Sequence, residues 1–416
     1  MIAGRFFLGL CAALLSTSQA RAEWFEVKTD HFDLTIDDTE ASARAFAERL
    51  EHFDAALRAL YSIGDSADRR NRPVKVYALQ SEPFMAACRC PGALGYYRTR
   101  PEGPYIFTAH MPQSDRKAKP GAWSSQTVLL HEYGHHFMYS NFPLAYPYWY
   151  SEGFAEFNAN VSFEDDGSII LGYPANYRAE ALSNGDVNMK VLMEPNTYGF
   201  DGGDRLYGRG WLLTHYLMLN PKRPGQLSKY LQALNKGTTS YKAAQATFGD
   251  LGVLDKELDA YRRGVLSPPL RIPPAKAPVR VEVKRLSKGQ AEMLPLHLLF
   301  TDGIRKTYRM GHAMRAAKVG ERYPDDLIVQ EQLAEIEFIA ERLDRADAAA
   351  DRALKLDPNS VDAMVVKGKI AVQRLVDAKS SDAAAWTAAR GWYLKANKRS
   401  PDAVMPLYLF HSSFAV

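Results

Sequence analysis

His131-Glu132-Tyr133-Gly134-His135 is the stretch that decides most about the fold of this chain, and sixteen residues separate it from Glu152. Residues four apart lie on one face of a helix, so the imidazoles of His131 and His135 can reach the same ion. Glu132 points beside that ion, where a water molecule would need a base. A catalytic zinc ion takes three protein ligands and keeps one position open. The pattern predicts one zinc ion (Zn2+) held by His131, His135 and Glu152; the alternative is a buried helix whose histidines are satisfied by hydrogen bonds.

The helix that carries this motif is expected over residues 122–142. Ser124 or Ser125 can cap its N-terminus. Gly134 in its interior costs about 1 kcal/mol relative to alanine. That cost indicates that another part of the chain passes close to this position.

Two further helices are expected to complete the candidate site. Ser151 caps the first of them, and Glu152 and Glu156 share one of its faces because they are four residues apart. The second helix is strongly apolar and spans residues 206–219, and helices continue to about residue 263.

Before the motif, residues 23–120 have the mixed pattern of an α/β region. Apolar residues at helical spacing predict a helix over residues 39–61. His110 ends the last predicted strand, either near the metal cleft or at a partly exposed strand end. Alternation of apolar and polar residues predicts four strands, over residues 24–29, 31–36, 73–79 and 105–110.

After the motif region, a Pro-rich stretch over residues 266–290 predicts a stiff linker. Pro324 and Pro358 in the segment that follows are 34 residues apart, which is the period of tetratricopeptide repeats. Residues 346–359 resemble the second helix and turn of such a repeat. We expect an all-helical repeat region over residues 291–416, with a generic bundle of helical hairpins as the alternative.

The N-terminal residues 1–22 have the pattern of a signal peptide rather than of folded structure. Arg5 precedes an apolar stretch, residues 6–15, that is too short to span a bilayer. Ala20-Arg21-Ala22 is a small-residue cleavage site. The alternative is a membrane anchor. We expect cleavage near Ala22 and export, to a bacterial periplasm or beyond.

Charge and cysteine content restrict the class of partner. Removing residues 1–22 takes away two arginines and no acidic residue, so the net charge falls from +4 to +2. A nearly neutral chain does not indicate nucleic acid as a partner, and no later segment is long and apolar enough to span a membrane. Cys88 and Cys90 form a disulfide or remain thiols.

The motif region resembles the gluzincin metallopeptidases, the superfamily of thermolysin and aminopeptidase N, over residues 125–219. H-E-Y-G-H followed by W-Y-S-E-G-F-A-E-F is similar to the aminopeptidase pattern H-E-x-x-H, then W-L-N-E-G-F-A. The resemblance implies that Glu152 is the third ligand. It also implies that Glu156 supports a zinc-bound histidine, the alternative being a surface charge on an amphipathic helix.

A second part of the resemblance concerns Tyr207. Tyr207-Gly208-Arg209-Gly210 is similar to the Y-x-K-G of aminopeptidase N-like enzymes. That similarity implies that Tyr207 stabilises the oxyanion formed during attack on the carbonyl. The alternative is a core tyrosine that packs with Trp211 and His215.

These patterns predict an exported zinc metallopeptidase of peptide or protein substrates, with Glu132 as general base. The G-x-M-E-N segment that grips a free amine in aminopeptidases is missing, so endo- and exopeptidase action stay open. The alternative function is a catalytically silent metal-binding core, with repeats that recruit a protein partner. The fold class is α+β, a gluzincin-like core (small mixed sheet plus helices) followed by an all-α tetratricopeptide-like repeat domain. The expected division is 1–22 signal peptide, 23–120 α/β part, 121–265 helical zinc-binding part, 266–290 linker and 291–416 repeats.

Overall fold

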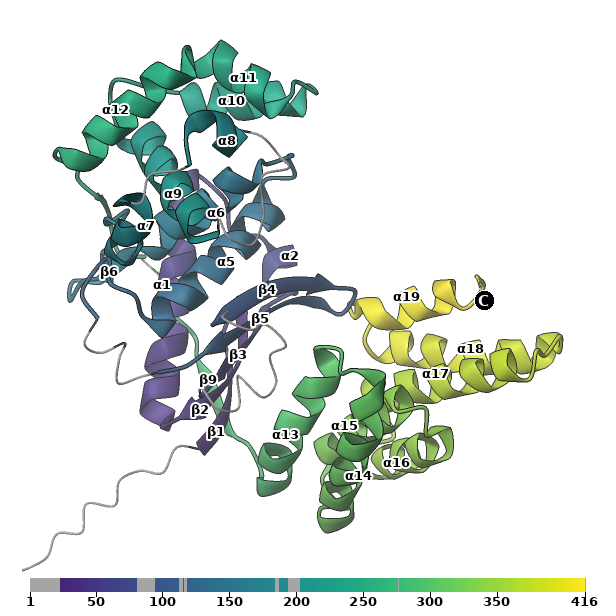
Figure 1. Ribbon diagram of the computed structural model, residues 1–416. Coiled ribbons are helices and arrows are strands. Elements are labelled where there is room, and N and C mark those ends of the chain that lie inside the picture. The colour runs from purple at the N-terminus through teal and green to yellow at the C-terminus, as the bar shows by residue number, and fades with distance from the viewer. Residues whose placement is uncertain are drawn as a thin grey trace, which may run out of the picture.

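The computed structural model describes residues 23–80, 94–111, 115, 118–183, 187–193, 203–275 and 277–415 (Figure 1). The expected signal peptide, residues 1–22, and the Cys88 and Cys90 pair lie outside these residues. The described chain has a mixed α and β region up to β9 and an all-helical region after it. The predicted α+β class is therefore confirmed at this level.

A six-stranded mixed sheet organises the first region, in the order β4-β5-β3-β2-β1-β9. The neighbours β2, β3 and β5 run parallel, whereas the pairs β1 with β2, β4 with β5 and β1 with β9 run antiparallel. All four predicted strands are present. The strands are β1 (Glu23–Lys28), β2 (Phe32–Asp38), β3 (Val74–Leu79), β4 (Gly95–Arg100), β5 (Gly103–Ala109) and β9 (Glu282–Arg285).

One face of this sheet packs against two long helices, α1 (Glu40–Tyr61) and α5 (Ser125–Asn141). Thr39 caps α1 by accepting a hydrogen bond from the Ser42 amide. Ser124 caps α5 in the same way through the Thr127 amide, which confirms one of the two predicted caps. A single apolar core runs from the sheet through these helices to the helices beyond them, so the predicted parts 23–120 and 121–265 fold as one unit.

Glycines allow the helices of the motif region to cross closely. A Cβ on Gly134 would lie 3.0 Å from the Cα atom of Ala155 in α6 (Tyr148–Ala159). The segment expected to pass close to Gly134 is therefore α6. A Cβ on Gly153 would lie 2.5 Å from the carbonyl oxygen of Gly210 in α9 (Gly203–Leu219). These contacts fix α6 between α5 and α9.

The expected role of Ser151 as a helix cap is wrong. The helix begins three residues earlier, at Tyr148, and its N-cap is Pro147, which has no side-chain capping bond. Proline has a fixed φ that suits a helix start. Ser151 is therefore in the first turn, where its hydroxyl is free to bond other groups.

Shorter elements complete the first region around α9. Among the described residues, no helix is long and apolar enough to cross a membrane. The remaining elements are α2 (Ala67–Arg70), β6 (Val161–Phe163), β7 (Ile169–Leu171), η1 (Asn176–Arg178), α7 (Ala179–Ser183), α8 (Met189–Met193), α10 (Gln226–Asn235), α11 (Ser240–Phe248) and α12 (Leu251–Arg263).

The Pro-rich segment predicted as a linker supplies two strands instead. β8 (Leu270–Ile272) pairs with β7, and β9 pairs with β1 at an edge of the main sheet. Both strands are at sheet edges, where the absent N–H of a nearby proline costs least. Backbone hydrogen bonds therefore hold the segment to the first region at two places.

The C-terminal helices follow each other as antiparallel pairs (Figure 1). Leu294 and Leu298 of α13 pack against Leu79, Tyr105 and Phe107 on the outer face of the sheet. The helical region thus covers the sheet face that α1 and α5 leave open. Its helices are α13 (Lys288–Thr301), α14 (Lys306–Arg322), α15 (Leu327–Ile339), α16 (Leu343–Leu356), α17 (Val361–Asp377), α18 (Ala383–Arg399) and α19 (Val404–Ser412).

Candidate metal centre

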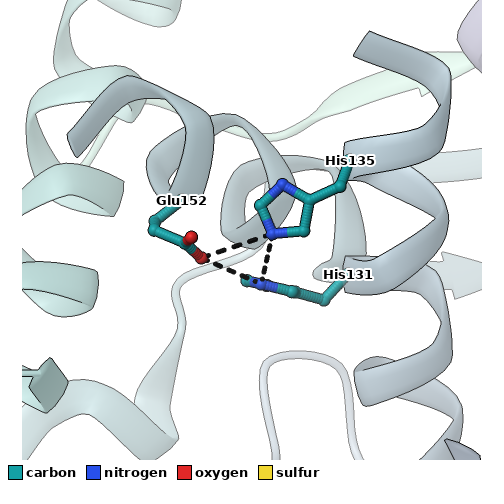
Figure 2. Close-up of side chains that lie close together, drawn as sticks. All are labelled: His131, His135 and Glu152. Carbon is teal, nitrogen blue, oxygen red and sulfur yellow. Dashed lines mark hydrogen bonds and ion pairs between the residues drawn. The ribbon is translucent and has the colours of Figure 1, made fainter. Parts of the chain in front are cut away.

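Three side chains of the motif converge on one point (Figure 2). The Nε2 atoms of His131 and His135 are 3.2 Å apart, and they lie 3.2 Å and 3.4 Å from Oε2 of Glu152. A tetrahedral zinc ion with ligands at about 2.0–2.2 Å requires ligand atoms about 3.3 Å apart. The three donor atoms therefore fit a single zinc ion, and all three residues are buried.

The helix crossings described above create this convergence. His131 and His135 are one turn apart on α5, and Glu152 is on the first turns of α6. Because Gly134 has no Cβ, α6 approaches α5 closely enough for the Glu152 carboxylate to meet both rings. The site thus depends on a glycine that lies between its ligands in sequence.

Polar groups behind the two imidazoles orient them. Nδ1 of His131 lies 3.6 Å from Oε1 of Glu156, and Nδ1 of His135 lies 3.3 Å from the Ser151 hydroxyl. Ligand histidines usually hold their second ring nitrogen in this way. The Glu156 side chain is 1 % exposed, so the alternative of a surface charge is wrong.

The charges of the candidate ligands and of the glutamates around them compensate each other. Burial alone lowers the pKa of His131, but Glu152, Glu156 and Glu132 outweigh it and raise that pKa to about 9. Burial raises the pKa of Glu152, but hydrogen bonds from the two histidines dominate and hold it below its usual range. Because a ligand histidine must be neutral, binding of a metal cation would displace the proton from His131.

The side chain of Glu132 extends from α5 toward the edge strand β4. Its Cγ atom would be 3.3 Å from a Cβ on Gly95, so β4 passes directly over it. Burial raises the pKa of the Glu132 carboxyl, and His131 and His135 only partly offset this. A carboxyl with a raised pKa exchanges protons more readily near neutral pH, as a general base must.

Tyr207 lies at the candidate site rather than in the core. Its ring stacks on His131 with a centroid distance of 5.9 Å, and its hydroxyl is 3.3 Å from that of Tyr148. Trp211 and His215 pack against each other instead, with ring centroids 5.2 Å apart. Burial raises the pKa of Tyr207, so its hydroxyl remains a donor.

Several residues around the triad were not predicted from the sequence as neighbours of the ligands. Tyr148 and Ser151 occupy the first turn of α6 next to the ligands, and Tyr177 and Arg178 of η1 bond to Glu156. Tyr148 and Ser151 lie beside the motif in the sequence and could have been proposed as neighbours. No local pattern marks Tyr177 and Arg178, because a tertiary contact brings them to Glu156.

His110 does not belong to the centre. Its Nε2 atom is 2.8 Å from the carboxylate of Asp38, and its ring packs on Phe46. It is buried, so the expectation of an exposed strand end is also wrong.

A second group of potential metal ligands, His31, Glu51 and Asp54, is a charge network instead. Arg58 and Arg69 donate to the Asp54 carboxylate at 2.6 Å and 2.7 Å. Its oxygens are therefore already occupied by cations.

Neither a family model, nor a curated protein, nor a solved structure matches this chain. Any proposal of function therefore depends on the chemistry of the site itself.

Proposed function

We propose that this chain is a zinc-dependent metallopeptidase of gluzincin type, exported by means of its signal peptide. The observation that carries the proposal is the triangle of donor atoms from His131, His135 and Glu152, with sides of 3.2–3.4 Å. Two histidines and one glutamate with a fourth position left to solvent are a ligand set of catalytic zinc. A bound zinc ion would supply a Lewis acid that polarises a carbonyl and lowers the pKa of water.

Glu132 is the general base in this proposal. It follows His131 directly in α5, and its raised pKa suits a group that accepts a proton and later releases it. It takes the proton of the attacking water and returns a proton to the leaving amine. Glu156 and Ser151 keep the two imidazoles in the orientation that directs Nε2 toward the site.

Tyr207 is the donor to the oxyanion. Its phenol stays protonated because burial raises its pKa, and its ring is held against His131. A hydrogen-bond donor aimed at developing negative charge accelerates acyl transfer. Tyr148 lies next to it and keeps the hydroxyl at the site.

The edge strand β4 supports a peptide as the substrate class. Among the described strands β4 pairs only with β5, so no described strand covers its outer edge. An extended peptide can bind such an edge through backbone hydrogen bonds. It would then lie along Glu132, beside the stacked rings of Tyr97 and Tyr139.

The helical region is proposed to be a tetratricopeptide-like array. Helices α15 and α16 form a hairpin, and α17 begins 34 residues after α15. An array of this kind offers a surface for a protein partner or for the substrate itself.

Zinc content and digestion of a mixture of peptides test the proposal. The wild-type protein should contain one zinc ion per chain and cleave peptides, and a chelator should abolish cleavage. Glu132→Gln should keep the zinc and lose at least about 100-fold in kcat, because it cannot accept the proton. His135→Ala should lose the zinc.

Two outcomes would contradict it. Full activity of Glu132→Gln with zinc bound would exclude the proposed mechanism. Stoichiometric zinc in a wild-type protein that cleaves no peptide would favour the metal-binding interaction module.

A further inference from the structure

The carboxylate of Glu156, which lies behind His131, is held by two consecutive residues of η1. Nη2 and Nε of Arg178 donate to Oε1 at 2.6 Å and 3.1 Å, and the Tyr177 hydroxyl donates to Oε2. A buried carboxylate requires such partners, because an uncompensated charge in the interior is costly. Arg178 pairs with Glu156 at 2.6 Å, and His131 itself lies 3.6 Å from the same carboxylate oxygen.

The same guanidinium also contacts Tyr207. Its central carbon lies 4.9 Å from the centroid of the Tyr207 ring, and that ring stacks on His131. The Arg178 side chain therefore contacts both Glu156, which lies behind His131, and Tyr207, which lies beside His131. A planar guanidinium can do this because it combines a fork of N–H donors with a flat face that stacks on aromatic rings.

The segment that carries Arg178 is held in place by α5 and α9. The Asn176 amide donates to the Gly121 carbonyl at 2.9 Å, just before α5 begins. A Cβ on Gly121 would be 2.1 Å from the Pro174 carbonyl oxygen, so these two backbone segments are in direct contact. On the other side, a Cβ on Gly208 of α9 would lie 3.6 Å from Cβ of Arg178. The position of Arg178 is thus fixed relative to both helices.

We propose that Arg178 is a positioning residue of the metal centre, which sets Glu156 behind His131 and holds the Tyr207 ring against it. Through Glu156 it controls metal affinity, and through Tyr207 it controls the oxyanion donor. The second effect rests on the proposed peptidase function, whereas the first requires only that the triad binds zinc.

Variants at Arg178 separate the two effects. Arg178→Met removes both the charge and the flat donor face. We expect its zinc dissociation constant to rise about 10–100-fold, as is usual when a group that orients a ligand is lost. Arg178→Lys keeps a cation near Glu156 but cannot cover the Tyr207 ring. It should keep most of the zinc affinity and lose kcat with little change in KM.

Arg209→Met is the matched control. Arg209 is also an ion-paired arginine of the first region, on α9 two residues from Tyr207, and it bonds to Asp255 and Asp259 rather than to the site. Its loss should lower thermal stability but leave the zinc dissociation constant unchanged. Zinc affinity is measured by competition with a chromophoric chelator, which does not depend on peptide hydrolysis.

A double-mutant cycle decides whether Arg178 acts through Glu156. In the Glu156→Gln background, Arg178→Met should weaken zinc binding by less than about twofold, because the coupled interaction is already gone. Additive losses would overturn the proposal, as would a zinc affinity of Arg178→Met equal to that of Arg209→Met. If Arg178→Met does not fold, Arg178→Lys is measured instead. An unchanged kcat in Arg178→Lys would overturn the proposed effect of Arg178 on Tyr207.

The two proposals fail in different ways. A wild-type protein that binds zinc without cleaving peptides removes the peptidase function, and the chelator competition still tests Arg178. A wild-type protein that cleaves peptides while Arg178→Met matches Arg209→Met removes the positioning role alone. A wild-type protein that binds no zinc overturns both.

Discussion

Two phenols, those of Tyr207 and Tyr148, lie 3.3 Å apart at the candidate site, and their surroundings assign them different tasks. The ring of Tyr207 contacts both His131 and Arg178. Tyr148 is 40 % exposed, and its hydroxyl bonds to the ligand Glu152 as well as to Tyr207. A donor held in place stabilises a transition state because no reorganisation is needed during the reaction, whereas a hydroxyl engaged by Glu152 is less available to the oxyanion.

Tyr207→Phe should therefore lower kcat by about 10²–10³-fold with little change in KM, since only the transition state loses a hydrogen bond. Steady-state kinetics on a cleaved peptide check this, and zinc content should stay at the wild-type level. Tyr148→Phe is the control, with a loss below about tenfold. A larger loss in Tyr148→Phe than in Tyr207→Phe would reverse the assignment.

The charge network around His31 lies behind α5, the helix that carries His131 and His135. His31 Nδ1 lies 2.8 Å from Glu51 and Nε2 3.1 Å from Asp65, and the Tyr133 hydroxyl donates to Asp54 of the same network. Burial alone lowers the pKa of His31, but hydrogen bonds and charge from these carboxylates raise it above its ordinary value of 6.5. The charged imidazolium is therefore favoured by folding.

This raised pKa gives stability a pH dependence of known sign. Because the folded pKa of His31 exceeds the unfolded one, its contribution is complete below about pH 6.5 and is lost as pH rises through the folded pKa. The urea midpoint should fall as pH rises above about 6.5, and His31→Gln should flatten this part of the curve. An unchanged pH profile in His31→Gln would exclude a role for this residue.

At the scale of helices, the crossing of α6 and α9 depends on Gly153. A Cβ there would lie 2.3 Å from the Thr214 hydroxyl and 2.5 Å from the Gly210 carbonyl oxygen. Backbone cannot move aside as a flexible side chain can, so α6 would be displaced together with Glu152. Gly153→Ala should cost about 1–3 kcal/mol of unfolding free energy, the usual range for overpacking, and weaken zinc binding.

Gly311→Ala is the matched control for this substitution. Gly311 is in the interior of α14, and a Cβ there would meet no atom within 4 Å. Alanine should stabilise α14 by up to about 1 kcal/mol through helix propensity. Denaturant unfolding and chelator competition on both variants separate a steric effect from propensity. Normal zinc affinity in Gly153→Ala would show that α6 tolerates the displacement.

Elements with strong local patterns could be predicted from the sequence. The helix expected over residues 39–61 is found at Glu40–Tyr61, because its apolar spacing and the Thr39 cap are both local. The donor triad was also predictable, since the spacing of His131 and His135 on a helix defines their common face.

Elements defined by distant contacts could not be predicted. β4 was not identified because Tyr96 packs under α13 while Tyr97 packs against α5, so both faces are covered and no alternation appears. β9 pairs with β1 across more than two hundred residues, and its own sequence shows prolines nearby. Arg178 reaches Glu156 only through the path of η1, which no motif encodes.

At the scale of the whole molecule, the helical region is part of the protein core rather than a tethered accessory. α13 covers the aromatic outer face of the sheet, and Arg98 of β4 pairs at 2.9 Å with Asp302 at the end of α13. The Asp302 side chain is 1 % exposed and that of Arg98 is 46 % exposed, so this ion pair is at the rim of the contact between the regions. Because β4 passes over Glu132, the helical region also supports one wall of the candidate site.

A fragment of residues 23–285, which keeps the six strands of the main sheet but none of the helices α13–α19, should therefore be poorly stable. It would expose Leu79, Tyr105 and Phe107, and burying each such side chain contributes about 1.5–3 kcal/mol. Since 1 kcal/mol corresponds to about 2–4 °C for a domain of this size, we expect its Tm to fall by roughly 10 °C or more. Differential scanning fluorimetry and binding of an apolar dye measure the fall and the exposed face.

The control is a fragment of residues 23–379, which loses α18 and α19 but keeps α13 on the sheet. Neither of the two lost helices contributes to the cluster of apolar residues between α13 and the sheet. The sheet should stay covered, and the zinc affinity of this fragment should match that of residues 23–416. If the 23–285 fragment instead unfolds at the temperature of the longer fragment, the outer face of the sheet does not need α13. The C-terminal helices would then be a separate module, and their contact with β4 would have no part in shaping the site.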